Sequence, residues 1–154
     1  MKLSYMLRAT IPALATLAVL MLTGCETMSS AWDSTRGVFS KSNVTLSGDE
    51  QVPPVNTKAS GSGTITVKDD MTVGGSVKTS GVVGTMAHIH MAPPGRNGPV
   101  IITLVKSKDG NTWSVPEGAK LTEAQFNAYR AGGLYVNVHS AANKGGEVRG
   151  QLRP

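Results

Sequence analysis

Two neighbouring stretches decide the fold: LYVNVHS at residues 134–140 and EVRGQL at residues 147–152. In both, apolar and polar side chains alternate, and this period of two is typical of a β-strand with one face in the core. Gly145 and Gly146 lie between the two stretches and permit a tight turn. We therefore predict two antiparallel strands joined as a hairpin or near-hairpin.

The same short alternations occur upstream, from Val44 onward, and turn-forming residues separate them. Signals such as KDD at 68–70 and DGN at 109–111 supply residues that accept a positive φ or favour a turn. The further predicted strands are residues 43–46, 61–67, 72–79, 86–91 and 100–106. Short strands at this spacing predict an all-β fold, an antiparallel sandwich or barrel.

One short helix is expected near residues 122–131. Thr122 and Gln125 form a capping box, in which each side chain satisfies a backbone N–H that has no partner within the helix. Gly132 and Gly133 can then supply a left-handed stop.

The composition excludes several classes of protein. Only 16% of the residues are charged, and 18 glycines and 8 prolines argue against a coiled coil or a bundle of long helices. The formal charge of +5 is spread along the chain, and only 2 Trp, 3 Tyr and 2 Phe are available to stack on bases. We therefore expect no nucleic acid as a partner.

The N-terminal residues 1–24 have the order of a secretory signal peptide. Lys2 and Arg8 precede an apolar run at 11–22, which is shorter than the about 20 residues that a transmembrane helix needs. LTGC at 22–25 resembles the bacterial lipobox, and this resemblance implies a lipid on Cys25. The predicted organisation is a signal peptide at 1–24, a lipidated tether at 25–42 and a domain at 43–154.

Cys25 is the only cysteine, so the chain can form neither an internal disulfide nor a cysteine-based zinc site. Glu26 follows it, and lipoprotein sorting associates aspartate at that position with inner-membrane retention. We therefore expect a lipid-anchored protein of the bacterial cell envelope, sorted to the outer membrane, with its domain facing the periplasm or the exterior. Its partners would be the membrane, through the lipid, and a metal ion or envelope proteins.

All three histidines lie in predicted strands. Because successive side chains of a strand alternate faces, His88 and His90 project together while Ile89 points into the core. The same parity places His139 on the polar face of its own strand. If the two strands are neighbours, three imidazoles meet.

Three neutral imidazoles suit zinc or copper and leave a fourth position free. Met86 has the same parity as His88 and His90, so its thioether is a candidate soft ligand that favours Cu(I), whereas Met91 faces the other way. The predicted metal ligands are therefore His88, His90 and His139, with Met86 as an additional candidate.

Three functions remain open from the residues alone. The first is non-catalytic binding of copper or zinc by the histidines. The second is a metal-independent structural or protein-interaction module, in which the histidines only form hydrogen bonds within the fold. The third is a metal-dependent enzyme, for which the sequence offers no G-x-S-x-G motif and fewer histidines than a copper–zinc superoxide dismutase uses. We expect no catalysis.

The chain from about residue 44 to 153 resembles the CHRD domain, a module named after chordin. Three blocks carry the resemblance: LSGDEQVPPV at 46–55; AHIH at 87–90 with PGRNGPV at 94–100; and GGLYVNVH at 132–139 with GGEVRGQL at 145–152. The resemblance implies an immunoglobulin-like or superoxide-dismutase-like barrel with recurrent HIH and NVH histidines, and it implies no particular reaction. Within these blocks, Arg149 is expected to pair with an acid such as Glu50.

Overall fold

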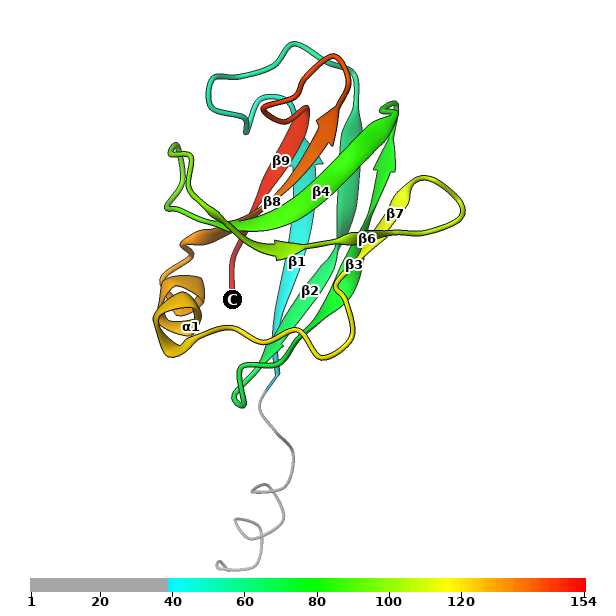
Figure 1. Ribbon diagram of the computed structural model, residues 1–154. Helices are drawn as coiled ribbons and strands as arrows, with labels where there is room; N and C mark the ends of the chain where they lie inside the picture. Colours follow the sequence, from blue (N-terminus) through cyan, green and yellow to red (C-terminus); the bar gives the residue numbers. More distant parts are fainter. Residues whose placement is uncertain (1–38) are drawn as a thin grey trace, which may run out of the picture. The chain divides into compact units, whose positions relative to one another are not determined.

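The computed structural model describes residues 39–154 of the chain (Figure 1). These residues form nine strands and one helix, which loops connect. In chain order they are β1 (Phe39–Ser47), β2 (Ser60–Lys68), β3 (Val73–Ser80), β4 (Gly84–Met91), β5 (Val100–Thr103), β6 (Val105–Lys106), β7 (Thr112–Ser114), α1 (Glu123–Arg130), β8 (Leu134–Ser140) and β9 (Val148–Leu152). No helix within this region is long and apolar enough to span a membrane.

All strand pairings are antiparallel, in the order β5-β4-β8-β9-β1-β2-β3-β7-β6. The two strands at the ends of this order, β5 and β6, are separated in the chain by Leu104 alone, so the sheet wraps into a nearly closed barrel. The predicted all-β antiparallel sandwich or barrel with one short helix is confirmed. The predicted pairing of the last two strands is also confirmed, with Val138 opposite Val148.

The core consists of the inward faces of these strands. Its fully buried members include Leu46, Ile65, Val77, Ile89, Trp113, Leu134, Val136, Val138, Val148 and Leu152. They come from strands on every side of the barrel, so the apolar alternation read from the sequence corresponds to the inward face of one closed sheet.

The predicted strand at 100–106 is two strands, because the chain turns at Leu104. The Leu104 N–H donates to the carbonyl of Ala87 at 2.9 Å, and the Leu104 side chain is buried in the core. β7 was not predicted, since a strand of three residues with one apolar side chain has no measurable period. That side chain, Trp113, is 1% exposed and lies opposite Val77.

β1 begins at Phe39 and therefore includes residues 39–42, which the sequence analysis assigned to the tether. This part of the strand was not predicted, because its buried residue Ser42 is polar and so does not contribute to an apolar alternation. The Ser42 hydroxyl lies 3.0 Å from that of Tyr129 and donates to the carbonyl of Arg153 at 2.8 Å. The rest of the predicted tether, the signal peptide and Cys25 lie outside the described residues.

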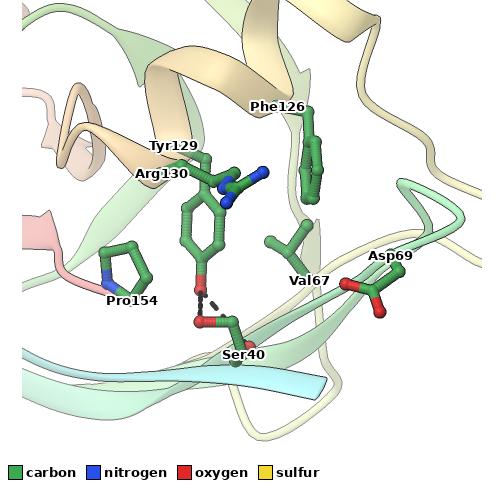
Figure 2. A pocket seen from close by; sticks show the side chains of 7 residues that line it. All are labelled: Ser40, Val67, Asp69, Phe126, Tyr129, Arg130 and Pro154. Atoms are coloured by element: carbon green, nitrogen blue, oxygen red, sulfur yellow. Dashed lines mark hydrogen bonds between the residues drawn. The ribbon is translucent and has the colours of Figure 1, made fainter. Parts of the chain in front are cut away.

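The short helix α1 begins as predicted. The Gln125 N–H donates to the Thr122 hydroxyl at 3.3 Å, and the Thr122 N–H donates to the Gln125 side chain at 2.9 Å. Tyr129 projects from the helix to β1, where its hydroxyl lies 3.1 Å from the hydroxyl of Ser40 (Figure 2). This contact ties the helix to the first strand beside a hollow lined by residues that include Phe126 and Val67.

We expect Thr122→Ala to lower the free energy of unfolding by about 1 kcal/mol, because the substitution leaves a helix N–H without its capping oxygen. Urea unfolding of the two proteins measures the difference. Thr122→Ser keeps the hydroxyl and should retain most of the stability. Equal losses in the alanine and serine variants would contradict a role for the capping hydroxyl.

Candidate metal centre

The three histidines lie on adjacent strands and on the same face of the sheet. β4 pairs with β8 so that His88 is opposite Asn137, His90 is opposite Tyr135, and Met86 is opposite His139. Directly opposed residues share a face of the sheet. The condition on which the predicted site depended, that the HIH and NVH strands are neighbours, is therefore met.

The imidazoles meet at one point. One ring nitrogen from each of His88, His90 and His139 can be chosen so that all three lie within 4.8 Å of one another. Nδ1 of His88 is 3.0 Å from Nε2 of His139. Three nitrogens around a tetrahedral zinc are separated by about 3.3 Å, as follows from a Zn–N bond of about 2.0–2.1 Å. The cluster therefore needs only small side-chain movements to surround an ion.

Backbone carbonyls fix the ring orientation of two histidines. Nδ1 of His90 is 2.9 Å from the carbonyl of Gly98, and Nδ1 of His139 is 2.9 Å from the carbonyl of Lys144. Because a carbonyl only accepts, each Nδ1 carries the proton and each Nε2 is left as an acceptor, which on His139 lies 3.0 Å from Nδ1 of His88. Ligating histidines in metalloproteins are commonly oriented by such a bond from the other ring nitrogen.

Nε2 of His90 is the observation that points most directly to a ligand. It is buried and has no hydrogen-bond partner within residues 39–154. A buried acceptor without a partner costs about 1–3 kcal/mol, and a bound cation would remove that cost. His88 already uses Nδ1 to donate to Nε2 of His139, so ion binding requires His88 to carry its proton on Nε2 instead.

Burial favours the uncharged form of His88 and His90. It is the main cause that lowers the pKa of His88, and the neighbouring His139 and His90 lower it further. Burial also lowers the pKa of His90, although the Gly98 carbonyl acts in the opposite direction. Neutral imidazoles are the form that binds metal ions, so the site is available without the loss of ring protons.

The same shifts predict a pH dependence of stability in the metal-free protein. In the unfolded chain a histidine has a pKa of about 6.5, so below that pH it takes up a proton that the folded His88 and His90 resist. The free energy of unfolding should therefore fall between about pH 7 and pH 5 in urea titrations with a chelator present. A His88→Gln/His90→Gln variant should show a smaller fall. An equal fall in both proteins would contradict the assignment.

A second layer supports His90. The ring of Tyr135 stacks on it, with centroids 4.8 Å apart and planes 7° apart, and the guanidinium of Arg149 lies 3.5 Å from the centroid of the Tyr135 ring. Arg149 is 1% exposed and donates to Asn97 at 3.3 Å and to Gln151 at 3.2 Å. Burial lowers its pKa, and the negative charge of Glu50, the acid expected near it, acts in the opposite direction.

The loop at 92–99 provides the contacts that hold this layer. The carbonyl of Gly98 accepts from His90, and its N–H donates to the Tyr135 hydroxyl at 3.2 Å. A Cβ at Gly98 would lie 1.9 Å from the carbonyl oxygen of Met91, so only glycine fits there. Sequence reasoning missed the roles of Gly98 and Lys144, because a backbone carbonyl has no signature in the side-chain pattern.

The segment between β1 and β2, residues 48–59, covers the outer face of β8 and β9. Gln51 donates to Asn137 at 2.8 Å, and Thr57 donates to Glu147 at 2.8 Å. In Figure 1 this segment and the β8–β9 loop lie together at the same end of the barrel. Because of this cover, all seven residues of β8 are buried, including those on its polar face.

The four predicted ligands differ in how far they are exposed to solvent. His90 and His139 are each 7% exposed, and His88 is half-buried at the open side of the cluster. Met86 is opposite His139 and is 52% exposed, so it lies at the surface. Three histidines offer a fit for zinc or copper, since their free nitrogens converge and one of them lacks any other partner.

Comparison with known proteins identifies the class. A family model of the CHRD domain matches residues 42–152, which include the whole of this site, and the chain belongs to the CHRD domain family. A search of curated proteins found no match, and a search of solved structures found none either.

Proposed function

We propose that this protein is a lipid-anchored lipoprotein of the bacterial cell envelope, whose CHRD domain binds one zinc or copper ion through His88, His90 and His139 without catalysing a reaction. The buried and unpartnered Nε2 of His90 is the observation that carries the metal-binding part. The convergence of the three rings and the carbonyls that orient two of them support it.

A zinc titration tests the metal-binding part. The reference protein is the full chain with Cys25→Ser, purified in detergent, so that no thiol competes for the ion. We expect one Zn(II) per chain in competition with a chromophoric chelator, and no binding to the same chain with His88→Ala, His90→Ala and His139→Ala. Equal binding by the two proteins would refute the proposed site.

The proposal of a lipid anchor depends on the sequence alone, namely on the LTGC motif at 22–25 at the end of an apolar run. Mass spectrometry of the mature protein from bacterial membranes should find a first residue, Cys25, that carries acyl chains. Several acyl chains give durable membrane attachment. A mature protein that begins elsewhere and carries no lipid would contradict the anchor and the outer-membrane location, and would leave the metal site untouched.

A second candidate is a metal-independent interaction module. The hydrogen bond between His88 and His139 favours it, because two of the three histidines already satisfy one another. On this view the triple variant is less stable in chelator, and added metal changes nothing in either protein. Turnover of superoxide or of simple esters that required both metal and the histidines would instead favour an enzyme.

A further inference from the structure

We propose that the ion the centre selects is monovalent copper, and that the thioether of Met86 completes its coordination. This inference rests on the proposed metal-binding function and adds the identity of the ion and a fourth ligand. Its basis is the placement of Met86 and the charge of the groups around the three rings.

An irregularity in β4 lies directly before Met86. The pairing with β8 passes from Gly84 opposite Ser140 to Met86 opposite His139, so Thr85 is an extra residue. The Thr85 hydroxyl donates to the carbonyl of His139 at 3.2 Å and fastens this bulge to β8. The pairing from Met86 onward is regular, so Met86 has the same parity as His88, and bulges are frequent next to functional sites.

Met86 is therefore on the face that carries the three histidines. The Cβ atoms of directly opposed residues are about 4.5–5.5 Å apart, a separation that the long side chain of methionine can bridge. Half of the Met86 side chain is exposed, so it is free to turn toward the ion without disturbing the core. Met91 lies at the end of the same strand, opposite Leu134, and packs against the core instead.

The charge around the rings favours a cation of low charge. The groups that hydrogen-bond to or stack on the histidines from the rest of the described chain are the carbonyls of Gly98 and Lys144 and the ring of Tyr135, none of which is an anion. Beyond Tyr135 lies the positive guanidinium of Arg149, and the only carboxylate known to act on it in the described chain, Glu50, offsets part of its charge.

The chemistry of the four proposed ligands also favours monovalent copper. Three imidazoles and one thioether are neutral ligands, so a divalent ion would remain doubly charged near Arg149, whereas a monovalent ion would carry half of that charge. Thioether sulfur is a soft ligand of the kind that Cu(I) prefers.

A Cu(I) titration tests the inference with a matched pair of variants. The reference protein, Met86→Leu and Met91→Leu are each titrated with Cu(I), kept reduced by ascorbate, in competition with bicinchoninate. We expect Met86→Leu to weaken Cu(I) binding at least about tenfold and to leave Zn(II) binding unchanged, and Met91→Leu to change neither. Excess Zn(II) should not displace bound Cu(I) from the reference protein.

X-ray absorption at the copper edge provides a second readout. The reference protein should show a sulfur ligand that disappears in Met86→Leu and remains in Met91→Leu. If all three proteins bind Cu(I) equally and none shows sulfur, or if Zn(II) displaces the copper, the inference is overturned while histidine-dependent metal binding stands. If neither Zn(II) nor Cu(I) binds through the histidines, the proposed function itself fails.

Discussion

Replacing His139 by alanine should weaken Zn(II) binding by more than about 100-fold, because loss of a group that merely orients a ligand already costs about 10–100-fold. His139 is central to the cluster: Nε2 lies 3.0 Å from Nδ1 of His88, and its ring centroid is 6.1 Å from that of His90. Its Nδ1 is held by the carbonyl of Lys144, so Nε2 carries the lone pair that would bind the ion once the His88 proton has moved to the other nitrogen of that ring.

The measurement is competition with a chromophoric chelator, with melting temperature as a second readout. Bound ion stabilises the folded state, so zinc should raise the melting temperature of the reference protein and leave that of His139→Ala unchanged. Val83→Ala is a suitable control, because Val83 is 86% exposed and close in sequence to the HIH segment. Zinc affinity that is equal in His139→Ala and Val83→Ala would contradict the three-histidine site.

Replacing Arg149 by alanine should lower the free energy of unfolding by about 3 kcal/mol. The substitution removes a cation that lies 3.5 Å from the Tyr135 ring, and it leaves the oxygens of Asn97 and Gln151 without their donor. Cation–π contacts contribute about 2 kcal/mol when desolvated, and the buried oxygen of Gln151 costs about 1–3 kcal/mol when it is unsatisfied, whereas water can replace the donor to the exposed Asn97. Relief of the buried charge offsets part of the loss.

Urea unfolding measures this loss, and Arg153→Ala is the matched control. Arg153 is exposed at the end of the same strand, so removal of its side chain should change stability by less than about 0.5 kcal/mol. Arg149→Lys keeps the charge but not the planar group, and should recover only part of the stability. Equal stability of Arg149→Ala and Arg153→Ala would show that the stack beside His90 does not support the fold.

The fold was predictable where side chains alternate strictly. β8 and β9 have a clear period of two, and the capping box marks the start of α1, so their positions follow from local physics. β7 and the first residues of β1 were missed. Their stability comes from burial of Trp113 and from the contact of Ser42 with Tyr129, which join residues distant in sequence.

The part of the candidate site that depends on the alternation of side chains along a strand was predictable. The alternation of His88 and His90, and of His139 with Val138, placed all three on one face once β4 and β8 were neighbours. The alternation along a strand does not predict where loops lie over the sheet. The bonds from His90 and His139 to the carbonyls of Gly98 and Lys144 could therefore not be predicted. The charge of Glu50 does act on Arg149, as expected, but the sequence does not show that the ring of Tyr135 lies beneath the guanidinium.

The central claim is that one ion lies between the rings of His88, His90 and His139. X-ray absorption at the zinc edge of the full chain with Cys25→Ser, loaded with one equivalent of zinc, tests it most directly. We predict three imidazole nitrogens at about 2.0–2.1 Å, with the outer scattering of the rings, and loss of that signal in the triple histidine variant. A shell of oxygen ligands without ring scattering, the same in both proteins, would contradict the account.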